Sequence, residues 1–263
     1  DTMLEAAIKY KTIVDEFDDA IKAGEFKMYL QPQISAKTRR LTGAEALVRR
    51  IKPDGTIISP IDFIPVYEKS GLISRYIWEQ AAAKLGEWKK AGINMSISVN
   101  ISPKDFYYID IFNTFAGLIK KYDIEPSNLK IEITETTIMS DVPNLMGELE
   151  ELRKAGFTLE MDDFGSGYSS LNTLKDINVD VLKVDMGFIK ETKNVKKSRI
   201  ILASVIKMAK ELNLLIITEG VETEEQVDNL TKLGCDVFQG YYFSKAIDVN
   251  EFEKRYLYRK KAG

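Results

Sequence analysis

Short apolar runs along this chain each lead into a polar side chain that could take part in chemistry, and most of these side chains are carboxylates. The eight runs lead to Gln31, Glu45 with Arg49, Asn100, Glu132, Asp162 with Asp163, Lys183, Glu219 and Gln239. One acid at a strand end means little, but a series of them indicates strand ends that converge on one polar site. Burying many like charges together is costly unless a cation binds among them. Hard divalent cations prefer oxygen ligands, so the sequence predicts one or two of them at this site.

The rest of the composition narrows the chemistry. The chain contains no histidine, which excludes Ser-His-Asp and Cys-His catalysis and every histidine-containing metal site. Its one cysteine, Cys235, excludes disulfide frameworks and multi-cysteine zinc sites, and a reducing cytoplasm is the expected location. Cys235 is expected to be a buried small apolar residue rather than a nucleophile. Any reaction must therefore use Asp, Glu, Lys, Asn or Gln side chains together with metal and water.

The pair Glu45 and Arg49 combines opposite charges on one strand. Residues four apart on a strand face the same side, so the two side chains can meet one ligand. A carboxylate for a cation beside a guanidinium for an anion suits a metal-bound phosphate. A surface ion pair is the alternative interpretation of the same two residues.

Adjacent Asp162 and Asp163 point in opposite directions on a strand, so both reach one site only where the strand ends. Gly165 follows at once, which fits a sharp exit loop close to a ligand. An acidic turn with a helix-capping Asp is the alternative. The tripeptide at 163–165 also matches the metal-binding tripeptide of kinases, but the chain lacks a glycine-rich loop before a lysine strand and a histidine-containing catalytic loop.

Further polar residues fit one site with divided roles. Glu132 and Glu135 are three apart across a strand end, so one could ligate a cation while the other braces a neighbouring loop. Lys183 could polarise a water or steady a developing charge, or it could form a purely structural salt bridge. Asn100 and Gln239 offer neutral oxygens, which bind a cation without adding negative charge.

The elements that must position these residues follow a regular pattern. With 263 residues and 44% hydrophobic content the chain can form one large domain, and a single α/β barrel takes roughly 250 residues. Strand-like runs alternate with helical patterns, which predicts repeated βα units and a mostly parallel sheet. A capping box at Thr223 and Ser-Pro pairs at 59–60 and 102–103 predict helix starts. In barrels of this type the chemistry lies on the βα loops.

Charge and termini set the expected domain organisation. The net charge of −3 gives no basic surface for polymeric nucleic acid. No apolar run approaches the ~20 residues of a membrane helix, and the acidic start lacks a signal-peptide profile and looks like a fragment boundary. Residues 1–24 show helical spacing, either as a helix packed on the barrel or as a connector from an upstream signalling domain. We expect a barrel over residues 25–257 and a solvated basic tail over 258–263.

At this point the chain resembles the EAL domains, the cyclic di-GMP phosphodiesterases of bacterial signalling. Besides Glu45-Ala46-Leu47, the resemblance rests on ordered motifs at 31–32, 63–65, 71–73, 99–100, 132–135, 162–170, 183–185, 219–222 and 239–241. It covers roughly residues 25 to 255, and every catalytic position of the pattern is matched. The departures are peripheral, with Tyr67 where alanine is common and Ala246 where proline is common.

The resemblance implies a fold and an activity. The fold is a modified TIM-type (β/α)8 barrel with one antiparallel strand. The activity is hydrolysis of one phosphodiester bond of cyclic di-GMP to give linear pGpG, with Mg²⁺ or Mn²⁺, two ions per site, and inhibition by Ca²⁺. A homodimer and an upstream sensory or GGDEF domain are implied as partners.

The resemblance also implies a role for each residue. One metal ion is held by Glu45, Asn100, Glu132 and Asp162, and a second by Asp162 with Asp163. Lys183 and Glu219 contact or activate the attacking water, and Glu135 orders the loop at 163–170, which governs metal binding and dimer coupling. The substrate is held by Gln31, Leu47 and Arg49, and Gln239 completes the water and metal shell.

Two other functions fit parts of the sequence. A receptor could bind the dinucleotide without cleaving it, but silent members usually lack one of the acids, the lysine or the loop-ordering glutamate, and all are present here. An unrelated barrel enzyme acting on a sugar phosphate or enolate would explain the acids and the lysine, but not the ordered motifs.

Overall fold

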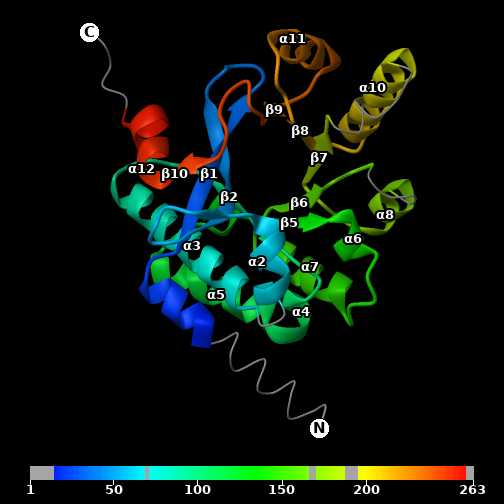
Figure 1. The fold of residues 1–263 in the computed structure, drawn as a ribbon. Coiled ribbons are helices and arrows are strands. Elements are labelled where there is room, and N and C mark those ends of the chain that lie inside the picture. Colours follow the sequence, from blue (N-terminus) through cyan, green and yellow to red (C-terminus); the bar gives the residue numbers. More distant parts are fainter. Residues whose placement is uncertain (1–14, 69–70, 166–169, 187–194, 259–263) are drawn as a thin grey trace.

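The computed structural model describes residues 15–68, 71–165, 170–186 and 195–258, and its sheet closes into a barrel (Figure 1). The eight barrel strands are β1 (Phe26–Ser35), β2 (Leu41–Ile51), β4 (Ile97–Ile101), β5 (Leu129–Thr134), β6 (Leu159–Asp162), β7 (Val181–Asp185), β8 (Leu215–Glu219) and β9 (Val237–Phe238). Two short strands extend the sheet at its margins: β3 (Ile57–Ile58) pairs with β2, and β10 (Ile247–Asp248) pairs with β1.

The strand directions confirm the predicted modified barrel. From β2 through β4 to β9, neighbouring barrel strands are parallel. Strand β1 is antiparallel to both of its barrel neighbours, β2 and β9, and its pairing with these two closes the barrel. An antiparallel pair needs only a short connection, whereas each parallel pair needs a long crossover.

The long β1–β2 hairpin corrects one detail of the sequence interpretation. Gln31 was expected where a strand ends, but it lies inside β1 and pairs directly with Glu45 of β2. The reason is that β1 and β2, with 10 and 11 residues, are much longer than the other barrel strands. A side chain can therefore enter the barrel from the middle of a strand as well as from its end.

The crossovers of the parallel part are mostly helical. The described helices are α2 (Pro60–Tyr67), α3 (Leu72–Lys90), α4 (Asp105–Tyr108), α5 (Ile111–Tyr122), α6 (Glu135–Ile138), α7 (Leu145–Lys154), α8 (Ser170–Asp176), α10 (Val195–Glu211), α11 (Glu224–Leu233) and α12 (Val249–Phe252). A 3₁₀ turn, Pro126–Asn128, precedes β5, and a π-helical turn, Glu253–Leu257, follows α12.

The sequence predicted the helix start at Thr223 correctly and the one at Ser102 incorrectly. The capping box at Thr223 is present, with Gln226 as its second member. The helix expected from Ser102 begins only at Asp105, because the Asp105 carboxylate accepts a hydrogen bond from the Ser102 backbone N–H (2.8 Å) and holds the preceding residues in a turn.

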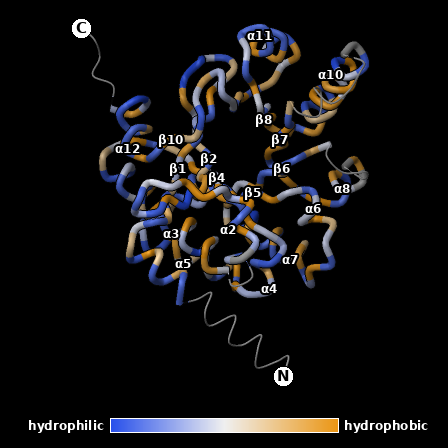
Figure 2. Tube along the Cα trace, viewed as in Figure 1, coloured by the Kyte–Doolittle hydropathy of each residue, from blue (hydrophilic) through white to orange (hydrophobic). Residues whose placement is uncertain are grey.

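The main hydrophobic core lies between the barrel and its helices. Side chains on the outer face of the strands are fully buried there, for example Ile131, Ile133, Leu182 and Val184. In Figure 2 the orange, hydrophobic stretches follow the strands, while blue stretches lie on the outer parts of the helices. A smaller apolar cluster, Val181, Ile217 and Val237, is formed by residues of three neighbouring strands.

The N-terminal part of the described chain packs on the barrel. Residues 15–22 are helical, and Phe17 and Ala20 are buried in a cluster with Phe26, Phe63 and Tyr67. Residues 1–14 and 259–263, which carry most of the expected connector and tail, lie outside the described residues, so the division at residues 24 and 257 stays a prediction. None of the described helices combines the length and hydrophobicity needed to cross a bilayer.

Candidate active site

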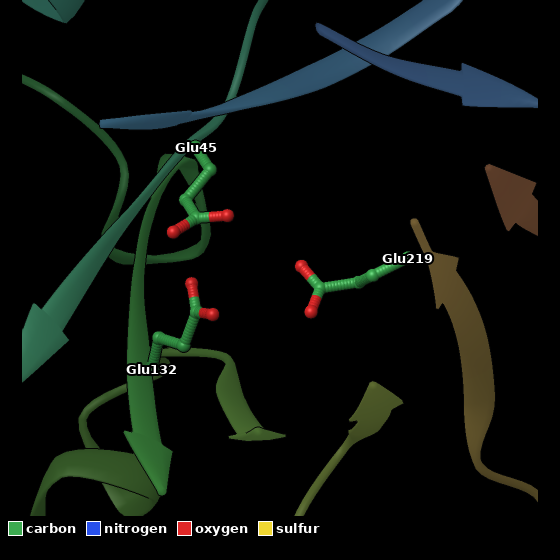
Figure 3. A group of neighbouring side chains, drawn as sticks. All are labelled: Glu45, Glu132 and Glu219. Carbon is green, nitrogen blue, oxygen red and sulfur yellow. The ribbon is translucent and has the colours of Figure 1, made fainter. Parts of the chain in front are cut away.

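Three carboxylates from distant parts of the chain meet inside the barrel. Glu45 comes from β2, Glu132 from β5 and Glu219 from the end of β8, and their ligand oxygens lie within 4.8 Å of one another. Figure 3 shows the three side chains pointing into a common space. Glu132 is fully buried and Glu45 is 7% exposed, so this acidic group is largely shielded from water.

Lys183 lies at the centre of these acids and is 1% exposed. Its ammonium is 2.8 Å from Glu219 Oε1, 3.4 Å from Glu45 Oε2 and 3.5 Å from Asp162 Oδ1. It also pairs with Glu132 Oε1. A buried charge is stable only when it is paired and hydrogen-bonded, so the lysine and the carboxylates hold one another in place.

The alternation of strand side chains explains why these residues point inward. Leu182 and Val184 are buried in the core between strands and helices, which turns Lys183 to the other face of β7. Ile131 and Ile133 place Glu132 in the same way on β5. The apolar partners on one face thus direct each charged group into the barrel.

The acids have opposite pKa shifts. Burial works to raise the pKa of Glu45, but Lys183 and hydrogen bonds from Gln239 and Asn100 hold it below its usual value. Burial raises the pKa of Asp162 to about 9, and the Glu219, Glu45 and Asp163 carboxylates contribute to this rise. Burial also raises the pKa of Glu219, and Lys183 offsets this only in part. The group therefore contains more carboxyl groups than one ammonium can pair, and without a further cation Asp162 is favoured in its neutral, protonated form.

The donor set fits a hard divalent cation. Among the described residues, Glu132 Oε2 and Asp162 Oδ1 are buried without a hydrogen-bond partner, which is costly for carboxylate oxygens. The surrounding ligand atoms are oxygens, as Mg²⁺ and Mn²⁺ prefer. The same chemistry is less suited to Zn²⁺, which favours nitrogen and sulfur ligands.

Three amide side chains bracket Glu45. Gln239 Nε2 donates to Glu45 Oε2 (2.5 Å), and Asn100 Nδ2 donates to Glu45 Oε1 (3.2 Å). Gln239 Nε2 also lies 3.4 Å from Gln31 Oε1. The backbone places Gln239 firmly, since its N–H donates to the Thr218 carbonyl oxygen (2.9 Å) and its carbonyl accepts from the Val221 N–H (3.2 Å). The next residue, Gly240, lies so close to the Val221 backbone that a side chain would not fit there.

Two depressions lie beside the carboxylate cluster, and Arg49 lines both. One is lined by Glu45, Leu47 and Asn100 among others, over Trp78. The other is lined by Gln31, Tyr241 and Lys245 among others. Apolar and aromatic walls with a few charged groups are typical of small-molecule sites. A ligand extending through both would pass Arg49 and Glu45.

Asp163 and Glu135 lie beside the group rather than in it. Asp163 has a left-handed backbone (φ 57°) just after β6, and it is not one of the three clustered carboxylates. Burial raises its pKa, as do Asp185, Glu45 and Glu135. Glu135 is fully buried at the start of α6, where Thr134 caps the helix. Residues 166–169 of the predicted loop lie outside the described residues.

Sequence reasoning missed a second polar layer deeper in the barrel. Gln33 and Glu160 are almost completely buried, and Glu160 accepts hydrogen bonds from Ser98 Oγ (2.7 Å) and Lys130 Nζ (3.0 Å). The sequence contained a signal for this layer. Ser98, Lys130 and Glu160 each lie two positions before a predicted site residue and so face the same side of their strands. Gln33 lies two positions after Gln31, because β1 runs in the opposite direction.

Comparison with known proteins identifies relatives for most of this chain. The family model described as EAL domain matches residues 14–246. The signalling protein YkoW of Bacillus subtilis is 36% identical over 239 residues, which cover 90% of this chain and 30% of that protein. The bifunctional diguanylate cyclase/cyclic di-GMP phosphodiesterase MucR of Pseudomonas aeruginosa is 32% identical, covering 91% of this chain and 36% of that protein. The chain thus spans about a third of the length of these two relatives.

Solved structures share the fold. A structure described as PaMucR phosphodiesterase in complex with c-di-GMP has a TM-score of 0.83 and 32% identity, covering 92% of this chain and 99% of that one. An EAL domain protein from Listeria monocytogenes has a TM-score of 0.76 and 32% identity, covering 92% of this chain and 97% of that one.

Proposed function

Because this chain belongs to the EAL domain family, we propose that it hydrolyses cyclic di-GMP to linear pGpG. The observation that carries the proposal is the convergence of Glu45, Glu132 and Glu219 around the buried ammonium of Lys183. The names of several relatives support it, among them the cyclic di-GMP phosphodiesterase RocR of Pseudomonas aeruginosa, which is 32% identical over 87% of this chain.

We propose Mg²⁺ or Mn²⁺ as the cofactor, with two ions per site. The first would be held by Glu45, Asn100, Glu132 and Asp162, and the second by Asp162 and Asp163. When bound, such ions stabilise negative charge on phosphoryl oxygens and lower the pKa of a coordinated water toward neutral values. Glu219 lies close enough to Glu45 and Glu132 to act as a metal ligand as well. This would add to the activation of the attacking water that the resemblance implies.

The chain's own residues have separate tasks in the reaction. Attack by a water oxygen on phosphorus breaks one P–O ester bond and yields a phosphomonoester and a hydroxyl group. Glu219, with its raised pKa, is suited to accept the proton of the water. The ammonium of Lys183, 2.8 Å from Glu219, would orient that carboxylate and stabilise negative charge that develops at phosphorus.

Substrate binding is assigned to the two depressions beside Glu45. Arg49 lines both and would pair with a phosphate, because a guanidinium binds phosphate with two parallel hydrogen bonds. Leu47 would contact the ligand in one depression and Gln31 in the other.

The test is a time course with purified protein, cyclic di-GMP and Mg²⁺ or Mn²⁺, in which linear pGpG is measured. We expect product that depends on the metal ion and stops when the ion is chelated. Stoichiometric binding of cyclic di-GMP without product would instead assign the chain to the receptors.

Metal binding should release protons, because Asp162 is protonated at neutral pH when its pKa is about 9. A cation displaces that proton, so we expect about one proton to be released per site at pH 7, and Mn²⁺ affinity to rise as the pH increases toward 9. Calorimetric titration with Mn²⁺ in buffers of different ionisation enthalpy counts the protons. Equal release at pH 7 and at pH 10 would be inconsistent with the raised pKa.

Replacing Glu135 with alanine should raise the Mg²⁺ concentration needed for half-maximal activity, by about tenfold or more, as for partners that orient ligands. The reason is that Glu135 is buried next to the exit of β6 and would act through the loop there rather than as a ligand. Glu135→Gln, which keeps the shape, should be affected less. Identical magnesium titrations for parent and Glu135→Ala would remove this role.

We further propose a homodimer and an upstream sensory or GGDEF domain as partners in the whole protein. The support for the upstream domain is that one relative is named as a bifunctional cyclase and phosphodiesterase and is much longer than this chain. The homodimer is what the family resemblance implies. The cytoplasmic location stays a prediction from cysteine content.

A further inference from the structure

We propose that Gln33 is a positioning residue for Glu45, acting through the side-chain amide of Gln239, and that Gly43 provides the space in which Gln33 does so. The inference rests on the proposed metal-dependent function and adds a residue to it. Gln33 touches neither the clustered carboxylates nor the two depressions that flank them in the part of the chain that the structure describes.

The contacts form a continuous chain of buried side chains. Gln33 Nε2 donates to Gln239 Oε1 (3.2 Å), and Gln239 Nε2 donates to Glu45 Oε2 (2.5 Å). Gln33 is 1% exposed and Gln239 is 3% exposed, so water competes little with these hydrogen bonds. In such surroundings an unmade hydrogen bond has a large cost.

The polarity of the two amides explains what Gln33 does. An ionised carboxylate only accepts hydrogen bonds, so Gln239 must turn its NH₂ group toward Glu45. Its carbonyl oxygen then faces Gln33 and requires a donor. The two ends of an amide are nearly equal in shape, so hydrogen bonds rather than shape select this orientation. Gln31 Oε1 accepts a hydrogen bond from the NH₂ end of Gln239 (3.4 Å), and the NH₂ group of Gln33 donates to its carbonyl end (3.2 Å).

Gly43 is needed for space. A Cβ at this position would lie 2.9 Å from Gln33 Oε1 and 2.7 Å from Ser96 Oγ. Both atoms belong to side chains that can move, and the Ser96 backbone oxygen, 3.3 Å from the added Cβ, needs only a small shift. Gly43→Ala should therefore fold but displace the Gln33 amide. This gives a physical role to the glycine two residues before Glu45.

The orientation of Glu45 follows from these contacts. Gln239 holds Oε2 of Glu45 while Asn100 donates to Oε1, so the carboxylate plane is set from two sides. Partners that orient a ligand in this way typically change metal affinity by about 10- to 100-fold when they are removed. Losing the Gln33 donor should therefore weaken metal binding without removing any ligand.

The experiment measures Mn²⁺ binding without substrate, by electron paramagnetic resonance of free Mn²⁺, together with turnover of cyclic di-GMP. The variants are Gln33→Met, Gln239→Met, the double variant of these two, and Gly43→Ala, both alone and combined with Gln33→Met. Methionine keeps the length of the side chain and removes the amide. Thr42→Val is the matched control, because the Thr42 hydroxyl donates only to the backbone carbonyl of Gln33 (3.1 Å).

We expect Gln33→Met to weaken Mn²⁺ binding about tenfold or more, and Thr42→Val to bind as the parent does. The double variant should bind no more weakly than Gln239→Met, because residues that act through one contact are not additive. Gly43→Ala should weaken binding in the same direction and have no further effect on Gln33→Met.

Unchanged Mn²⁺ binding in Gln33→Met, or fully additive losses in the double variant, would overturn the inference. Circular dichroism and thermal unfolding of each variant separate a folding defect from a positioning effect, and Gly43→Ala tests the same contact if Gln33→Met fails to fold. A parent protein that binds no Mn²⁺ would contradict the proposed function itself, which is a different outcome.

Discussion

Replacing Glu45 with glutamine is expected to abolish turnover of cyclic di-GMP and leave the fold intact. The substitution keeps the shape of the side chain but removes one negative charge from the group around Lys183. A ligand charge supports several kcal/mol of transition-state stabilisation, so the loss should reach about a thousandfold. Turnover measured with saturating Mn²⁺, beside circular dichroism of the same sample, checks both parts of the prediction.

A charge-matched control separates the site from a general effect of charge. Glu151→Gln removes the same charge from an exposed position on α7 and should leave turnover unchanged. Near-parental activity in Glu45→Gln would remove Glu45 from the metal site. Loss of the circular dichroism signal in that variant would show that the carboxylate is needed for folding, and the kinetic result would then rest on Glu132→Gln.

The second large effect is expected at Asp162, where one substitution should change both turnover and thermal stability. Asp162→Asn should abolish turnover and yet raise the melting temperature of the metal-free protein at alkaline pH. The pKa of Asp162 is about 9 in the folded chain, against an ordinary value of 3.8. The folded state thus holds a proton that the unfolded chain releases, so this group makes the protein less stable as the pH rises from about 4 to about 9. Asparagine stays neutral and removes that penalty.

Thermal unfolding with a chelator, at a series of pH values between 5 and 9, measures this effect. The melting temperature of Asp162→Asn minus that of the parent should grow with pH. Adding Mn²⁺ should stabilise the parent more than the variant, because a ligand that binds only the folded state raises its stability. A difference that is constant across the pH series would show that the pKa of Asp162 is not raised.

Much of the architecture was predictable from local pattern. The alternation of strand-like and helical runs predicted βα units and a mostly parallel sheet, and the acids at 132, 162 and 219 do converge with Lys183. That one strand is antiparallel was predicted only by the family resemblance, because hydrophobic alternation carries no information on strand direction, and the structure shows that this strand is β1. The position of Gln31 inside a long strand was not predicted for a related reason, since the length of the β1–β2 hairpin has no local signal.

Other features depend on the closed barrel and have no local signal. The proximity of Glu219 to Glu45 arises because β8 and β2 both contribute to one closed sheet, although the two residues are 174 positions apart in the sequence. The place of Lys183 at the centre of four carboxylates likewise follows from side chains entering from several strands. The deeper layer of Gln33 and Glu160 was overlooked because strand ends, rather than whole inward faces, were searched.

We propose that these acids form an oxygen cage for divalent cations, and anomalous diffraction from crystals grown with Mn²⁺ would locate the ions. We expect a manganese ion inside the barrel, coordinated by the side chains of Glu45, Glu132 and Asp162, with Asn100 completing the set. Manganese found only at exposed acids, with Lys183 still bridging Glu45 and Glu132, would contradict it.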